Sequence, residues 1–175
     1  KTALVCDRGL NIPMIIAHKR KGLPLESLVS DDVTALPTVD SIIDYQCTCF
    51  VPCSLENVIN ESNVERLKTK YVFEVANGPL TPEATDYLQS NNVLVFPDIL
   101  INAGGVTVSY FEYLQNNQNR LWTLEETREK LKVTIIKAFK KVYQRYLDTN
   151  EPLRRSAYIE AVRNLETSKQ RESYV

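Results

Sequence analysis

The fold is decided by residues 72–112, which read VFEVANGPLTPEATDYLQSNNVLVFPDILINAGGVTVSYFE. Two short apolar runs, 71–75 and 92–96, each end in small or turn-forming residues, as parallel strands do in an open α/β sheet. Between them, Thr81, Pro82 and Glu83 form a typical helix start, with a hydroxyl cap, a proline in the first turn and an acid near the positive end of the helix. The order strand, helix, strand predicts an α/β fold with a parallel sheet.

Polar side chains follow both of these predicted strands. Asn77 precedes Gly78, which is free to adopt a positive φ, and Asn102 precedes a pair of glycines. Small ligands bind just beyond the carboxyl ends of parallel strands, and an amide can both donate and accept a hydrogen bond. The two amides therefore suit a carboxamide or a ribose. The alternative is that each asparagine only satisfies hydrogen bonds of its own turn or cap.

Further elements extend the pattern on both sides. Strands are predicted at residues 2–6 and 47–51, the second ended by Pro52, and Asn60 is predicted to cap a helix over residues 61–68. Residues 8–35 show no clear periodicity, which indicates a variable connection with a short helix. The three strands from residue 47 onward are expected to lie side by side.

The glycines Gly104 and Gly105 fall in the first turn of a helix predicted from Asn102, where each costs about 1 kcal/mol of helix stability. The pair therefore implies either a close backbone approach or a ligand against the helix start. The predicted helix carries an apolar face made of Val106, Tyr110, Tyr113 and Leu114.

The last third of the chain is helical. Thr123 and Glu126 form a capping box, and an apolar stripe of period 3.6 follows it. A final helix is predicted over residues 152–167. We expect two parts: a partial dinucleotide-binding, Rossmann-like domain at residues 1–120 and a C-terminal helical segment at residues 121–175.

Composition narrows the possible functions. The 175 residues carry a net charge of -1 with neither sign gathered in one block, which argues against a nucleic-acid surface. No apolar run approaches the ~20 residues of a membrane helix. Three of the four cysteines cluster as Cys47, Cys49 and Cys53, without the paired spacing of a zinc site. We therefore expect no metal, and buried thiols in a reducing compartment.

Several segments together resemble one protein family. They are FVPCSLENVI at residues 50–59, FEVANGPLTPEA at 73–84 and VFPDILINAGGVTVSYFEYLQN at 95–116, with LWTLEE and PLRRSAY further on. The sequence resembles the glutamate, leucine, phenylalanine and valine dehydrogenases, and within that family the glutamate dehydrogenases. The likeness is strongest between residues 50 and 146.

The resemblance implies an activity and a set of site residues. The activity is oxidative deamination of glutamate to 2-oxoglutarate and ammonia, with hydride transfer to NAD or NADP. Cofactor contacts are implied for Asn77 and Asn102 on the nicotinamide side and for the backbone near three consecutive residues, Pro52, Cys53 and Ser54. Ser109 is implied to contact the side-chain carboxylate of the substrate, although an isolated helical serine commonly bonds back to the preceding turn.

Asp7 is a further candidate, because it directly follows the strand predicted at residues 2–6. An acid at the end of such a strand can hydrogen-bond an adenosine ribose. The alternative is a plain turn aspartate before Gly9. No residue of the chain is assigned a catalytic role.

The five glycines form no G-x-G-x-x-G turn, the feature that holds a pyrophosphate at a helix N-terminus. By resemblance, the chain begins inside the nucleotide-binding domain, at its second strand, and the family's catalytic lysine and aspartate belong to an earlier substrate domain. We therefore expect the chain alone to be unable to turn over. We also expect a homo-oligomer or a place in a larger assembly, in the cytoplasm or the mitochondrial matrix.

The alternative function is a degenerate, non-catalytic dehydrogenase remnant that acts as a structural or binding subunit of a larger complex. Four departures from the family pattern favour this alternative. Val75 stands where the family usually has glycine, Cys53 and Ser54 replace an alanine-like pair, Thr48 replaces an acid, and the phosphate-binding turn is absent. A branched side chain at Val75 would narrow the space beside a cofactor.

Overall fold

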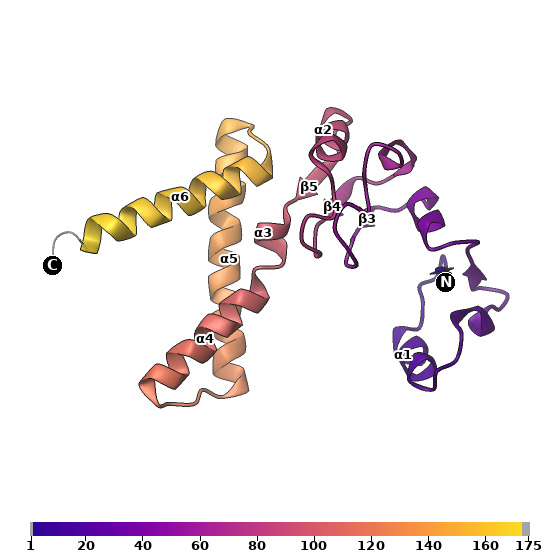
Figure 1. Cartoon of the computed structure of the whole chain (residues 1–175), viewed down its shortest axis with the longest axis horizontal. Helices are drawn as coiled ribbons and strands as arrows, with labels where there is room; N and C mark the ends of the chain where they lie inside the picture. Colours follow the sequence, from indigo (N-terminus) through magenta and orange to yellow (C-terminus); the bar gives the residue numbers. More distant parts are fainter. Residues whose placement is uncertain (1, 173–175) are drawn as a thin grey trace. The chain divides into compact units, whose positions relative to one another are not determined.

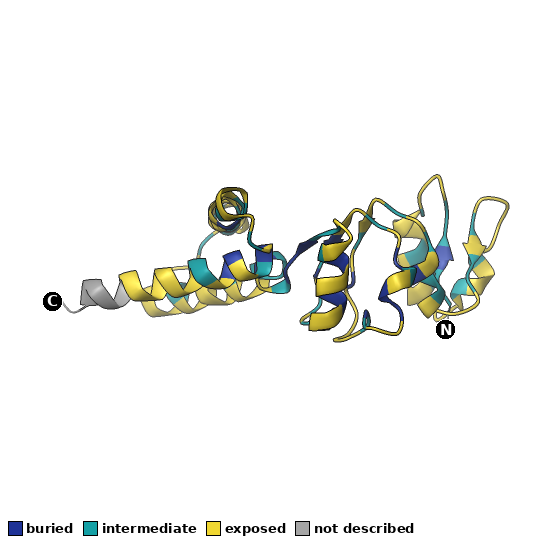
Figure 2. Cartoon of the chain, turned by 90° about the horizontal axis from the view of Figure 1, so that it is seen from above, coloured by how far each residue is buried: buried dark blue, intermediate teal, exposed yellow. Residues whose placement is uncertain are grey.

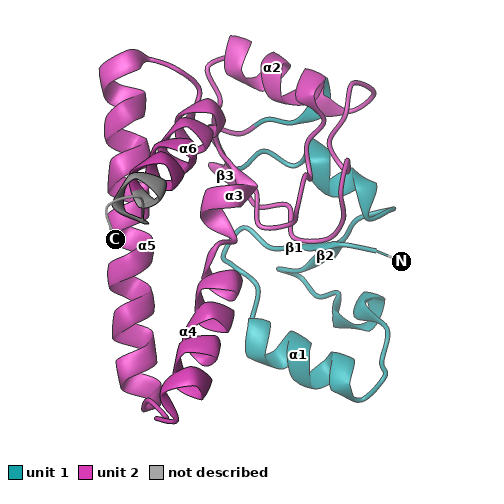
Figure 3. Ribbon diagram, turned by 60° about the vertical axis from the view of Figure 1, so that its left-hand side comes forward, with its two compact units in different colours: residues 1–47, 65–68 teal, residues 48–64, 69–175 magenta. Residues whose placement is uncertain are grey.

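The computed structural model describes residues 2–172, with side chains as far as residue 167. The chain divides into two compact units, Lys1–Cys47 with Glu65–Lys68, and Thr48–Val64 with Thr69–Val175 (Figure 3). The second unit contains a three-stranded parallel sheet and the long helices (Figure 1). The α/β fold predicted from the sequence is confirmed.

The first unit is built from short elements. It contains β1 (Leu4–Val5), α1 (Ile12–Arg20), the 3-10 helix η1 (Leu25–Leu28), β2 (Thr34–Ala35) and η2 (Asp40–Asp44). Arg66 donates hydrogen bonds of 2.8 Å to both Asp40 and Asp44, and thereby ties η2 to a later segment of the same unit.

The sheet of the second unit has the order β3–β4–β5, with all three strands parallel. Its strands are β3 (Cys49–Phe50), β4 (Tyr71–Phe73) and β5 (Leu94–Phe96), and η3 (Val64–Arg66) precedes β4. In register, Val72 lies beside Val95 and Phe73 beside Phe96. Because side chains alternate along a strand, the valine pair and the phenylalanine pair point to opposite faces of the sheet.

One of these faces carries a core shared with the C-terminal helices. The Phe73 and Phe96 rings stack with centroids 4.5 Å apart, and Phe96 packs in one cluster with Leu100, Val142 and Leu153. The last two residues belong to α5 (Leu124–Thr149) and α6 (Leu153–Glu172). The helical segment after residue 120 thus shares a core with the sheet.

The remaining helices are α2 (Pro82–Ser90), α3 (Asp98–Ile101) and α4 (Gly104–Gln118). Thr81 caps α2 by accepting a hydrogen bond from the Ala84 amide at 3.2 Å, and the helix buries Ala84 and Leu88. α6 is exposed along most of its described length (Figure 2). No helix within residues 2–172 is both long enough and apolar enough to cross a membrane.

The structure corrects three predictions. The helix predicted over residues 61–68 is wrong, because that segment holds only a turn and η3. The first strand is shorter than residues 2–6 and pairs antiparallel with β2, a strand that the sequence did not reveal. The prediction of buried thiols is wrong, because Cys49 and Cys53 are exposed and Cys6 and Cys47 are only half-buried.

Candidate functional site: the carboxyl edge of the sheet

The carboxyl ends of the three parallel strands bring together three of the predicted site residues. Asn102 donates from Nδ2 to Asn77 Oδ1 at 2.6 Å and to the Val75 carbonyl at 3.3 Å. The carbonyl of Pro52, which follows β3, accepts a hydrogen bond from the Ala76 amide at 3.0 Å. The turns after β3, β4 and β5 therefore form one continuous edge, which we call the strand-end edge.

The bond between the two asparagines leaves complementary groups available. Among the described residues, neither Asn77 Nδ2 nor Asn102 Oδ1 has a protein partner. An amide nitrogen donates and an amide oxygen accepts, so the pair offers one donor and one acceptor. A carboxamide needs this combination. The residues present thus fit the nicotinamide end of a dinucleotide.

Three glycines, Gly78, Gly104 and Gly105, follow the strand ends at this edge. Gly78 has a φ of +51°, as its place in the turn after Asn77 predicted. At Gly104 and Gly105, an added methyl group would meet no atom of another described element within 4 Å. A close backbone approach within the described residues therefore does not explain the glycine pair, and a ligand against the start of α4 stays a prediction.

The other predicted site residues are less closely tied to this edge. Cys53 and Ser54 follow Pro52 and are exposed, and the Cys53 thiol donates to the Val51 carbonyl at 3.3 Å. Ser109 is exposed on α4, seven residues beyond Asn102. Asp7 belongs to the first compact unit, where its carboxylate accepts a hydrogen bond from the Tyr45 hydroxyl.

A buried ionic cluster supports the strand-end edge, and the sequence did not reveal its role. Glu74, directly after β4, is completely buried. Its Oε2 accepts hydrogen bonds from the Asp98 amide at 2.9 Å and from Arg154 at the start of α6. Asp98 in turn accepts from Arg154 at 2.8 Å and from the Gly78 amide at 2.8 Å. The sequence feature that could have indicated this cluster is an acid, Glu74, placed directly after the apolar residues of a buried strand.

The two carboxyl groups of this cluster have pKa values shifted in opposite directions. Burial raises the pKa of Glu74 above its ordinary value, and the charge of Arg154 only partly offsets that effect. Burial also acts to raise the pKa of Asp98, but hydrogen bonds from the Gly78 and Ile99 amides, together with Arg154, outweigh it and hold this pKa below the ordinary value. The pKa of Arg154 is raised, because the two carboxylates outweigh its own burial.

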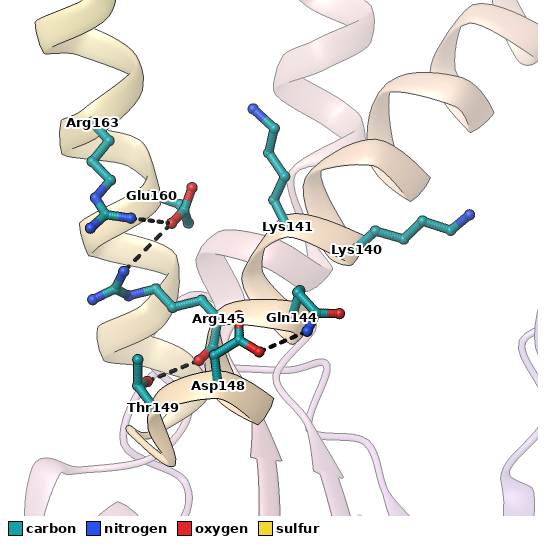
Figure 4. A pocket seen from close by; sticks show the side chains of 8 residues that line it. All are labelled: Lys140, Lys141, Gln144, Arg145, Asp148, Thr149, Glu160 and Arg163. Carbon is teal, nitrogen blue, oxygen red and sulfur yellow. Dashed lines mark hydrogen bonds and ion pairs between the residues drawn. The ribbon is translucent and has the colours of Figure 1, made fainter.

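A separate cavity of about 520 Å³ lies between α5 and α6 (Figure 4). Its lining is charged, and Glu160 lies within ion-pair distance of Arg163 and Arg145, at 3.3 and 3.8 Å. This cavity shares no lining residue with the strand-end edge.

Comparison with known proteins identifies the family. Residues 1–172 match the model of the Glutamate/Leucine/Phenylalanine/Valine dehydrogenase family. The cryptic catabolic NAD-specific glutamate dehydrogenase of Bacillus subtilis is 36% identical over 157 residues, which are 90% of this chain and 36% of that protein. The NADP-specific glutamate dehydrogenase of Synechocystis sp. is 34% identical over 165 residues, 91% of this chain and 39% of that protein.

Solved structures agree with the sequence comparison. Glutamate dehydrogenase from Peptoniphilus asaccharolyticus superposes with a TM-score of 0.75 at 30% identity, over 97% of this chain and 37% of that one. The hetero-hexameric glutamate dehydrogenase from Thermus thermophilus, in its leucine-bound form, gives a TM-score of 0.78 at 27% identity, over 92% and 37%. The chain spans a little over a third of the length of these relatives. It belongs to the glutamate, leucine, phenylalanine and valine dehydrogenase family.

Proposed function

We propose that the chain supplies the nicotinamide side of the cofactor groove in a glutamate dehydrogenase-type enzyme, which converts glutamate to 2-oxoglutarate and ammonia. The observation that carries this proposal is the bond from Asn102 to Asn77, which leaves one donor and one acceptor at the strand-end edge. The relatives named as NAD-specific and NADP-specific glutamate dehydrogenases support a nicotinamide cofactor.

In this proposal the cofactor, when bound, accepts the hydride, and the residues of the chain orient it. Asn77 and Asn102 hold the carboxamide, and the backbone near Pro52, Cys53 and Ser54 lines the groove. Ser109 contacts the side-chain carboxylate of glutamate. None of these side chains is a proton-transfer group, so the 175 residues alone should not turn over.

The alternative is a non-catalytic remnant that serves as a structural or binding subunit. Val75 is the feature that favours it, since its branched side chain directly follows Glu74 and is 39% exposed two residues before Asn77. A side chain there reduces the space for a nicotinamide ring.

Fluorescence titration of the purified chain with NADH and NADPH separates the two functions. Because the sequence has no phosphate-binding glycine turn, we expect weak binding, with enhanced nicotinamide fluorescence only at about millimolar cofactor. Asn102→Ala should abolish the enhancement. Asn116→Ala, which removes an exposed amide further along α4, should leave it unchanged.

Each other outcome has a defined meaning. No change in fluorescence at millimolar cofactor would favour the structural subunit. Micromolar affinity would contradict the expected effect of the missing phosphate turn. An enhancement that survives Asn102→Ala would contradict the assigned role of the amide pair.

We also propose that the chain associates with further copies or with a larger assembly. One relative is described as a hetero-hexamer, and the apolar face of α4 predicted from the sequence is solvent-exposed here, with Val106, Tyr110 and Tyr113 each more than half exposed. Exposed apolar stripes of this kind commonly mark interaction surfaces. Sedimentation equilibrium of the purified chain tests association between copies, and a single species of 20.0 kDa would contradict that form of the proposal.

A further inference from the structure

Arg154, the second residue of α6, places its guanidinium between two carboxylates that come from different strand ends. Its Nη1 donates to Asp98 Oδ1 at 2.8 Å and its Nη2 donates to Glu74 Oε2. These partners lie 56 and 80 residues away in the sequence. The planar guanidinium is suited to holding two carboxylates in a fixed arrangement.

Both carboxylates also accept hydrogen bonds from the turns that carry the amide pair. Asp98 Oδ2 accepts from the amide of Gly78, the residue after Asn77, at 2.8 Å. The backbone carbonyl of Asp98 accepts from the amide of Asn102 at 2.9 Å. Glu74 accepts from the Asp98 amide at 2.9 Å, which fixes the turn after β5 against the end of β4. Asp98, which Arg154 binds, therefore contacts the residue after Asn77 and Asn102 itself.

The cluster depends on Arg154 because little else balances its charge. Oε1 of Glu74 is buried without a hydrogen-bond partner, and Arg154 is the only basic side chain paired with Glu74 or Asp98 in the described part of the chain. A buried carboxylate that loses its counter-charge is strongly disfavoured. Without the guanidinium, either the turns after β4 and β5 rearrange or one of the two carboxylates takes up a proton.

We infer that Arg154 is a positioning residue for the strand-end edge. Through Glu74 and Asp98, it couples the start of α6 to the geometry of the amide pair and keeps Asn102 bonded to Asn77. The ligand of that edge rests on the proposed function, whereas the coupling itself is a property of the chain without cofactor. The competing explanation is that Arg154 only anchors α6.

Hydrogen exchange of the Asn102 side-chain amide, followed by NMR on the purified chain without cofactor, distinguishes these explanations. The resonance is assigned by its loss in Asn102→Ala. Arg154→Met keeps an apolar side chain of similar length and removes the guanidinium that binds both carboxylates. In this variant, exchange of the Asn102 amide should accelerate by about tenfold, because the net free energy of one hydrogen bond corresponds to a change of that size.

Arg145→Met is the matched control. Arg145 also lies within ion-pair distance of one residue just before α6 and one within it, Glu151 at 3.5 Å and Glu160 at 3.8 Å, but it pairs with neither Glu74 nor Asp98. It should leave the exchange rate unchanged. Equal acceleration in both variants would show simple anchoring of α6, and no acceleration in Arg154→Met would overturn the inference directly.

Arg154→Lys keeps the test decisive if the methionine variant does not fold. An ammonium retains the charge but cannot reproduce the two-carboxylate fork, so faster exchange at Asn102 is expected in a folded protein. Wild-type exchange in Arg154→Lys would contradict the inference. Because no cofactor is present, the result is independent of the fluorescence titration, and either proposal can fail alone.

Discussion

At the scale of single residues, the proximity of Asn77 and Asn102 could be predicted from the sequence. The ionic cluster that supports them could not. Asn77 and Asn102 each follow an apolar run, and parallel strands bring their carboxyl ends to one edge, so the sequence placed them together. The partnership of Glu74 with Arg154 spans 80 residues. A single sequence gives no sign of which distant cation pairs with a buried acid.

The opposite pKa shifts of Glu74 and Asp98 give a prediction for the pH dependence. As the pH falls from neutral, Glu74 should take up its proton above its ordinary value of 4.5, and Asp98 should do so only below 3.8. The folded pKa of Glu74 exceeds the unfolded one, so its protonation favours the folded state. The contribution of Asp98 is present above its unfolded pKa and is lost as the pH falls through its folded pKa.

Carboxyl-carbon NMR titration measures both midpoints. Glu74→Gln should remove the earlier step and leave a titration assigned to Asp98. A midpoint for Glu74 at or below 4.5 would contradict the dominance of burial over the charge of Arg154.

At the scale of elements, helices with explicit start signals were predicted well, and the segment after Asn60 was not. Asn60 Oδ1 accepts from the Ser62 amide at 3.0 Å, and Asn63 Oδ1 accepts from the Asn60 amide at 2.9 Å. These side-chain bonds close a turn in place of a helix. An asparagine can cap a helix or close a turn, and only the tertiary context decides between the two.

The capping box of α5 gives a prediction at the same scale. Thr123 accepts from the Glu126 amide at 3.1 Å, and the Glu126 carboxylate accepts from the Thr123 amide at 2.8 Å. Thr123→Ala should lower the free energy of unfolding by about 1 kcal/mol. Urea denaturation measures this loss.

Thr134→Ala provides the control within α5. Its hydroxyl bonds only to the carbonyl of Lys130 within the helix and is exposed, so the same substitution should change stability by less than about 0.5 kcal/mol. Equal losses in the two variants would contradict a specific role for the cap.

At the scale of the whole molecule, the sequence indicated two parts divided near residue 120, and that division remains a proposal. The compact units of the structure keep the terminal helices with the sheet. The reason is physical, since α5 and α6 contribute Val142, Leu153 and Ala157 to the cluster around Phe96. Helical periodicity identifies an apolar stripe but not the surface that it covers.

Leu153 tests whether this shared core stabilises the second unit. Its side chain is 1% exposed, so Leu153→Ala should lower the free energy of unfolding by about 2–5 kcal/mol. Leu165→Ala, on the same helix but 65% exposed, should cost less than about 0.5 kcal/mol. Thermal or urea unfolding measures both, and a small loss at Leu153 would mean that α6 is not part of the stabilising core.

The central claim is that this chain holds the nicotinamide end of a dinucleotide at Asn77 and Asn102. Saturation-transfer NMR with oxidised NAD or NADP tests it most directly, because it reports which cofactor protons contact the protein. We predict stronger transfer to the nicotinamide ring than to the adenine ring, and a loss of the nicotinamide signal in Asn102→Ala. Transfer that favours adenine, or a nicotinamide signal unchanged by Asn102→Ala, would contradict the account.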